Sequence, residues 1–331
     1  MRRIIGLVLV GLGVFALVAV PMLRFYAYPK LAVARIDQDS VSTLIGQDAT
    51  VFDVRSLAEI TTDLKTTVQT VGDIEASLKA RDGVRVWVST SSTRDSEGIV
   101  RSRSVQRVAF DATTGEAVNC CGEFYEAVEN SPEEIKHKGL VFKFPFDTQK
   151  KTYEFWDSTL RQAVPIDYKG VSEVDGVTVY VFRHAIEPTA TSTQNVPASL
   201  LGVDAEGIVS AERMYSNVRT LWVEPNTGVI LNRSEQQNNT IRYEGEDRIT
   251  TTRVVTGYDD ATIKANADKY GQLGSLLNLV RNLLPVVLLV IGPLLILLGL
   301  RLARRRPFAA RLSAVLEEMA RSSQTTRSSP T

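Results

Sequence analysis

Two adjacent cysteines are the most unusual chemical feature of this 331-residue chain, which has no others. Cys120 and Cys121 stand at the end of a predicted strand, directly before Gly122. A bond between them would lock a sharp turn, and glycine suits such a turn. Two buried thiols or intermolecular bridges are the alternatives. Because redox enzymes more often use Cys-x-x-Cys, we interpret the pair as a candidate vicinal disulfide and not as a catalytic dithiol.

Other residues that could carry out chemistry are sparse. His137 lies in a Lys-His-Lys triplet that is typical of a solvated surface, and His184 follows a predicted strand without an obvious partner. Five glutamates between residues 123 and 134 lack the EF-hand spacing that a calcium site would favour. The sequence contains no phosphate-binding glycine loop and no nucleophile elbow. We therefore expect no enzymatic activity, no metal site and no cofactor.

An aromatic-rich stretch lies between residues 142 and 156. Its rings either form an apolar surface for a ligand or belong to an ordinary hydrophobic core, which is the commoner role of buried aromatics. The candidate ligand surface consists of Phe142, Phe144, Phe146, Tyr153, Phe155 and Trp156.

Two uncharged runs predict membrane spans, and these set the organisation of the chain. Residues 4–23 and 282–300 are each long enough, at about 1.5 Å per residue, to cross a bilayer as a helix. The first run could instead be a cleaved signal peptide, but its apolar core is longer than usual. The tract 261–281 has helical spacing of apolar residues and predicts a helix that leads into the second span.

Basic residues flank both spans on their outer sides. Arg2 and Arg3 precede the first span, and the second is followed by Arg301, Arg304, Arg305 and Arg306. By the positive-inside rule, residues 1–3 and the basic tail 301–331 are cytoplasmic, which predicts a two-pass plasma-membrane protein. Residues 24–281, with 29 basic and 36 acidic residues, then lie outside the cytoplasm. Such an acidic domain is a poor partner for nucleic acid, so the expected partner is the lipid bilayer.

The external segment is rich in residues that favour strands. Alternation of side-chain type from Glu59 to Val71 predicts a half-buried strand. Further strands are predicted at 84–90, 100–111, 152–156, 177–183, 218–224, 229–236 and 248–257. Ser131-Pro132 looks like a helix start, and residues 187–206 look like a loop. The predicted fold is a mainly β (α+β) extracytoplasmic domain, residues 24–260, with curved antiparallel sheets between the two terminal helices.

A weak internal repeat suggests two tandem modules, at about residues 35–138 and 139–258. Asp82-Gly-Val-Arg-Val-Trp-Val88 matches Asp175-Gly-Val-Thr-Val-Tyr-Val181. Later in each half, Asp111-x-x-Thr-Gly115 matches Glu224-Pro-x-Thr-Gly228. Any β meander reuses such turns, but two landmarks in the same order favour duplication.

Several of these motifs together resemble one known family. They are the Phe-Pro-Phe and Tyr-x-x-Trp-Asp stretches, Asp111-x-x-Thr-Gly115, Cys120-Cys121-Gly122, Trp222-x-Glu-Pro-x-Thr-Gly228 and the two terminal spans. As a set they are similar to the actinobacterial PorA family of membrane proteins, and the resemblance covers nearly the whole chain. It implies a cell-envelope protein with two spans and a large external β domain, and it supplies no catalytic residues. The family name also implies a porin.

Three functions follow as hypotheses. A curved β domain held near a membrane is similar to the sheets of bacterial lipoprotein carriers, which favours binding or transfer of a lipid or other apolar ligand. The second hypothesis is an anchored structural or sensory protein that recruits envelope partners. The third is a porin-like channel, for which two helices per chain would have to assemble into an oligomer of unknown size.

Overall fold

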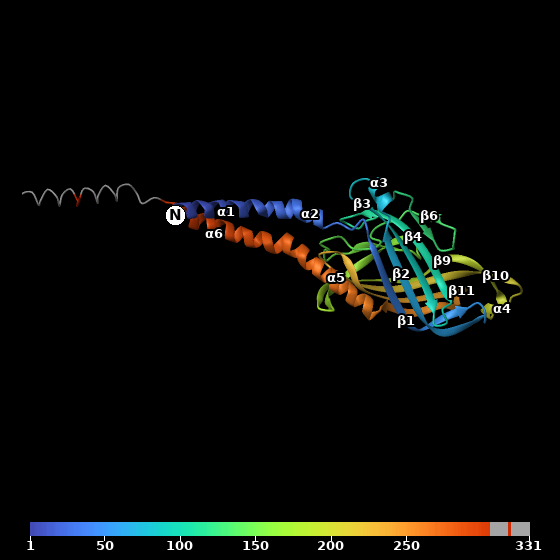
Figure 1. Cartoon of the computed structure of the whole chain (residues 1–331). Coiled ribbons are helices and arrows are strands. Elements are labelled where there is room, and N and C mark those ends of the chain that lie inside the picture. Colours follow the sequence, from blue (N-terminus) through green and yellow to red (C-terminus); the bar gives the residue numbers. More distant parts are fainter. Residues whose placement is uncertain (305–316, 319–331) are drawn as a thin grey trace, which may run out of the picture. The chain divides into compact units, whose positions relative to one another are not determined.

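The computed structural model describes residues 1–304 and 317–318, and it divides into two compact units (Figure 1). One unit contains Met1–Tyr28 together with the chain from Leu279 onward, and the other contains Pro29–Asn278. The predicted basic residues Arg305 and Arg306, with most of the predicted cytoplasmic tail, lie outside the described residues.

The first unit consists of two apolar helices. The N-terminal helix comprises α1 (Arg2–Met22), a π-helical turn η1 (Leu23–Ala27) and α2 (Tyr28–Leu31). The C-terminal helix contains a second π-helical turn, η2 (Leu279–Leu283), followed by α6 (Leu284–Ala303). Each is long and apolar enough to cross a membrane. The predicted spans are therefore helical, as expected.

Glycines bring α1 and α6 into backbone contact. A Cβ atom on Gly6 would lie 2.7 Å from the Gly299 carbonyl oxygen, and one on Gly13 would lie 2.6 Å from that of Gly292. The two pairs are seven residues apart on each helix, so the same faces meet twice. Small residues at such a contact allow close helix packing within a membrane. The two spans therefore form one closely packed hairpin.

The second unit is built on one antiparallel sheet of twelve strands. Its order is β6-β5-β4-β3-β2-β1-β12-β11-β10-β9-β8-β7, so the first and last long strands pair at the centre. The strands of the first half are β1 (Asp39–Asp53), β2 (Ala58–Gly72), β3 (Val84–Asp95), β4 (Val100–Asp111), β5 (Phe124–Glu126) and β6 (Glu133–Glu134). Those of the second half are β7 (Tyr153–Asp157), β8 (Gln162–Val174), β9 (Val177–Pro197), β10 (Ile208–Glu224), β11 (Val229–Tyr243) and β12 (Glu246–Tyr258).

Two short helices and one long helix complete this unit. Asp73 caps α3 (Ile74–Lys79) by accepting a hydrogen bond from the Ala76 amide at 2.9 Å. The turn α4 (Ala198–Leu201) follows β9. The long helix α5 (Asp260–Asn278) packs on β10 and β11 and confirms the helix predicted before the second span. The mainly β, antiparallel class predicted between two terminal helices is also confirmed.

The sheet curls over on itself (Figure 1), and β4 is connected to the last strand, β7. Two short segments, 116–118 and 139–141, bridge the gap between β4 and β7, and we call them the closing segments. The first pairs with β4 through Phe110 and Ala117, and the second pairs with β7 through Leu140 and Phe155. The amide of Ala117 donates to the Gly139 carbonyl at 2.9 Å, which joins the two segments.

The strand β7 lies between the two walls of this curled sheet. Phe155 packs with Phe182 and Leu221 on β9 and β10. The next residue, Trp156, packs instead with Val108 on β4. Because neighbouring residues of a strand point to opposite faces, β7 must separate the β4 wall from the β9–β10 wall.

Two predicted local structures were wrong. Residues 187–197 are not a loop but the second part of β9, paired with β10 from Ile208 to Asn217. Ser131-Pro132 does not begin a helix, because the strand pair β5–β6 occupies this region. In both places polar residues occur in strands with exposed faces, where the usual hydrophobic alternation is absent.

Candidate functional site

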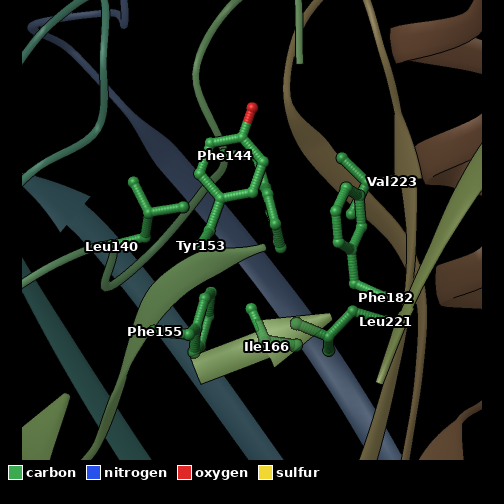
Figure 2. Packing of buried hydrophobic residues seen from close by; sticks show 8 residues of the cluster. All are labelled: Leu140, Phe144, Tyr153, Phe155, Ile166, Phe182, Leu221 and Val223. Atoms are coloured by element: carbon green, nitrogen blue, oxygen red, sulfur yellow. The ribbon is translucent and has the colours of Figure 1, made fainter. Parts of the chain in front are cut away.

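The six predicted aromatic residues lie in different parts of the interior. Phe144, Tyr153 and Phe155 belong to one buried cluster, in which Figure 2 shows side chains of β7 facing those of β9 and β10. The rings of Phe144 and Phe182 are 4.5 Å apart. The full cluster contains Leu140, Phe144, Tyr153, Phe155, Ile166, Phe182, Leu221 and Val223.

The remaining three rings lie elsewhere. Phe142 contacts Trp87 at a ring separation of 5.6 Å, Trp156 packs on His137 at 4.9 Å, and Phe146 lies beneath the Lys143 ammonium at 3.9 Å. The structure therefore distributes the set among several packing sites. That these rings contact an apolar ligand stays a prediction.

The segment that carries these rings connects the two turns matched in the repeat. The Phe146 amide donates to the Thr113 carbonyl at 3.1 Å, and the Phe144 amide donates to the Gly228 carbonyl at 2.8 Å. Gly115 and Gly228 both have positive φ, at +76° and +72°. In each turn the glycine amide donates to the carbonyl of the preceding acidic residue at 2.9 Å. This shared geometry fits a duplication, and the module boundaries stay a prediction.

Lys143 is buried beside these turns. Its Nζ donates to the Phe144 carbonyl at 2.6 Å, and the side chain is shielded from water. Burial lowers the pKa of Lys143 to about 7, although the nearby Asp111 carboxylate opposes this shift. The amine is therefore partly neutral near physiological pH.

A buried ion network lies on the inner face of β10 and β11. The Arg219 guanidinium contacts Glu235 at 2.7 Å and Asp157, at the end of β7, at 3.2 Å. Burial alone would raise the pKa of Glu235, but Arg219 and Arg233 hold it well below its usual range. Tyr215 donates from its hydroxyl to Asp157 at 3.0 Å. The network therefore ties β7 to the opposite wall through charged hydrogen bonds.

Polar atoms without partners adjoin this network. His184 is buried, and neither ring nitrogen has a hydrogen-bond partner within the described part of the chain. Burial and the Arg219 charge lower the pKa of His184 to about 4, so its imidazole is neutral at pH 7. A cavity of about 60 Å³ beside Tyr215 is large enough for water and is lined partly by Asn239.

The inner face of β1–β4 differs from that of β9–β11. Gln106 on β4 identifies this face, because its Oε1 accepts a hydrogen bond at 3.2 Å from Ser158, just beyond β7. The side chains in register with Gln106 on the neighbouring strands lie on the same face. One cross-strand row consists of Ser42, Val68, Ser91 and Ser104, which we call the open row because all four are only half-buried. The comparable row on the other wall, His184, Arg219 and Glu235, is buried.

Hydroxyl groups dominate the inner face of β1–β4. Thr66 and Thr93 are hydrogen-bonded at 2.8 Å, and Thr70 donates to Ser89 at 3.3 Å. These pairs lie on neighbouring strands and satisfy one another while leaving lone pairs for a ligand. This face was not predicted from the sequence, because Ser and Thr at every second position carry no motif. The strand register identifies it once the pairing is known.

The two cysteines are joined in a disulfide and pack on the outer face of the sheet, near α3. Two residues later, Glu123 is buried. Its Oε1 accepts a hydrogen bond from the Ala109 amide at 3.1 Å, and its Oε2 lies 2.9 Å from His137 Nδ1. His137 is thus fully buried, so its predicted surface position was wrong. The exposed lysines on both sides of His137 concealed that its own side chain points inward.

The basic residues predicted to flank the membrane occupy the ends of the apolar helices. Arg2 and Arg3 begin α1, Arg301 lies in the last turn of α6, and Arg304 follows it. Among residues 1–304 and 317–318, no group of three His, Cys, Asp or Glu side chains is placed to hold a metal ion.

Comparisons with known proteins agree with the resemblance in the motifs. The model of a family described as Porin PorA matches residues 5–301. A protein named Porin PorA from Corynebacterium amycolatum is 24% identical over 301 residues, which cover 71% of this chain and 77% of that protein. Another of that name, from Corynebacterium resistens, is 25% identical over 237 residues, which cover 52% of this chain and 57% of that protein.

Proposed function

This chain belongs to the porin PorA family, and from that premise we propose that it binds an envelope lipid on the inner face of β1–β4. The two apolar helices would hold it in the plasma membrane, with both termini cytoplasmic as the flanking arginines favour. The sheet unit would then meet lipids outside the cytoplasm.

The observation that carries the proposal is the difference between the two walls of the sheet. The inner face of β9–β11 is filled by the aromatic cluster and the ion network. The open row on β1–β4 remains half-exposed, although it faces the inside of the same curled sheet. A concave face that a protein leaves unfilled is a common form of binding site.

The chemistry of this face suits an amphiphile. Val68 and the buried Leu44 supply apolar contact, while Ser91, Thr93 and Ser104 supply hydroxyl donors and acceptors. A lipid would place its polar part on the hydroxyl groups and its chain along the apolar side chains. The rigid opposite wall would reduce the entropy lost on binding.

A channel, as the printed name of the relatives suggests, has weaker support. The glycine contacts between α1 and α6 leave no space for a pore within one hairpin. A channel would therefore require several copies around a central opening, and conductance in planar bilayers would detect it.

Tryptophan substitutions on β3 test the proposal. Ser91 points to the inner face and Ser92 to the outer face of the same strand, and both are half-exposed. Full-length protein in detergent is titrated with a fluorescently labelled phosphatidylethanolamine. We expect Ser91→Trp to weaken binding at least about tenfold, or ~1.4 kcal/mol, and the Ser92→Trp control to leave it unchanged. Equal binding by both variants, or no binding by the unmodified protein, would contradict the proposal.

A further inference from the structure

The connection between β4 and β7 depends on the two closing segments. The Asp111 amide donates to the Glu116 carbonyl at 2.9 Å, and the Trp156 amide donates to the Leu140 carbonyl at 2.7 Å. The remaining contacts are isolated bridges instead of a long ladder. Three further backbone hydrogen bonds, from the amides of Val118, Ala117 and Leu140, complete this short junction. Such short pairings favour local opening more than a long ladder does.

Along the chain, the disulfide lies between the first closing segment, residues 116–118, and the buried residue Glu123. Asn119 and Cys121 both have positive φ, at +49° and +67°, and Gly122 follows at +72°. Residues other than glycine adopt this conformation at a cost, and they remain in it only when their surroundings impose it. The bond between Cys120 and Cys121 is a covalent constraint on this turn.

The turn at residues 119–122 positions the next residue, Glu123. Its carboxylate fastens both sides of the junction, because Oε1 accepts from Ala109 on β4 at 3.1 Å and Oε2 contacts His137 Nδ1 at 2.9 Å. His137 lies two residues before the second closing segment and packs on Trp156 of β7. A continuous set of contacts therefore leads from the disulfide through Glu123 and His137 to β7.

We propose that the Cys120–Cys121 disulfide is a redox-sensitive latch on the junction between β4 and β7. A dithiol, either a small molecule or a dithiol oxidoreductase, would transfer two electrons and two protons to the disulfide. The Sγ–Sγ bond breaks, two thiols form, and the dithiol becomes a disulfide. Both cysteines are half-buried, so a reductant reaches them from the outer face.

Reduction releases the turn from its covalent constraint. The positive φ values of Asn119 and Cys121 then relax, and Glu123 is no longer held over His137. The closing segments open locally, while the wall formed by β9–β11 keeps its own ion network and aromatic cluster. This effect concerns access to the interior and does not depend on which ligand the inner face binds.

Hydrogen exchange with mass spectrometry on the full-length protein in detergent tests the latch. Labelling is compared with and without dithiothreitol, and again for a Cys120→Ala/Cys121→Ala variant. We expect peptides covering 116–118, 137–141 and 153–157 to exchange at least about tenfold faster after reduction, while peptides from β10 and β11 are unchanged. Reoxidation should restore the slow exchange.

A matched control separates the effect of the disulfide from that of the turn's backbone conformation. Asn119→Gly removes the unfavourable backbone conformation of a non-glycine residue but leaves the disulfide intact. Its exchange should stay slow until dithiothreitol is added. If the double variant does not fold, the reduction experiment on the unmodified protein decides alone. Unchanged exchange at the junction would overturn the proposal, and so would uniform acceleration throughout the sheet, which indicates a general stabilising bond.

Discussion

Asp157 and Arg219 form a buried ion pair at 3.2 Å, although they are 62 residues apart and lie on β7 and β10. Arg219 also contacts Glu235, and Arg233 contacts the same carboxylate, so Arg219 is the cation that Asp157 and Glu235 share. The pair fixes the strand that lies inside the curled sheet to the wall that it faces. The open row across the interior has no such connection, and this asymmetry underlies the proposed binding face.

Loss of the Arg219 charge should be strongly destabilising. Arg219→Met leaves Asp157 and Glu235 buried without their shared cation, and removing one partner of a buried pair typically costs about 3–5 kcal/mol. Urea unfolding followed by tryptophan fluorescence measures the change. The control is Arg242→Met, which removes a partly exposed pair with Asp247 and should cost less than about 1 kcal/mol. Similar losses for both variants would contradict the assigned role.

Lys143 should make stability depend on pH. Its pKa is about 7 in the folded protein and 10.5 in its ordinary state, so between these values the unfolded chain binds more protons. Stability should therefore rise as the pH increases from 7 to 10, by a total on the order of 5 kcal/mol at most. In Lys143→Met this slope should disappear, and stability at pH 7 should increase. The control Lys138→Met, at an exposed position, should keep the pH dependence of the unmodified protein. Unfolding midpoints measured at pH 7 and pH 9.5 give this dependence for each variant.

The glycine contacts between α1 and α6 can be tested within one helix. Gly13→Leu places a side chain against Gly292 and Ile296, whereas a Cβ on Gly11 meets nothing within 4 Å. We expect Gly13→Leu to separate the helices and lower the melting temperature in detergent, with a loss of about 1–3 kcal/mol from overpacking. Gly11→Leu should have little effect. The packing account fails if the two variants melt alike.

The turn at Gly228 should tolerate no side chain. Its φ is +72°, and a Cβ atom would overlap the Phe144 and Pro145 carbonyl oxygens of the connecting segment. Gly228→Ala should cost more than about 3 kcal/mol, because strain and overlap combine. Gly176→Ala has a similar φ of +79° but open space, so it should cost only about 1–2 kcal/mol. If the two variants lost the same free energy of unfolding, the backbone at Phe144 and Pro145 would have to move away from position 228, and the prediction would be wrong.

The sequence predicted the elements whose side chains follow a regular period. The two apolar helices and the strand pair β3–β4 were found at or near their observed bounds, since Val84 and Val100 begin clear patterns. The strands β1 and β8 and the second part of β9 were missed. Their exposed faces are rich in Ser, Thr and Gln, which strand propensity alone separates poorly from loops.

The candidate site was less predictable than the fold, because it depends on register. Asp157 was visible in the aromatic stretch, but nothing in the sequence paired it with Arg219 or Glu235. His137 was assigned to the surface from its lysine neighbours, although every second residue of a strand-like segment points inward. The Ser and Thr residues of the open row become a surface only when four strands are aligned.

The most direct test of the proposed function is photocrosslinking from the open row. A benzoylphenylalanine residue is placed at position 91 or at position 92 of the full-length protein, which is then irradiated in native membranes and analysed by mass spectrometry. The account predicts lipid adducts at position 91 and none at position 92, because adjacent residues of β3 face opposite sides of the sheet. Absence of adducts at position 91, or equal labelling at both positions, would contradict the claim that the inner face of β1–β4 binds lipid.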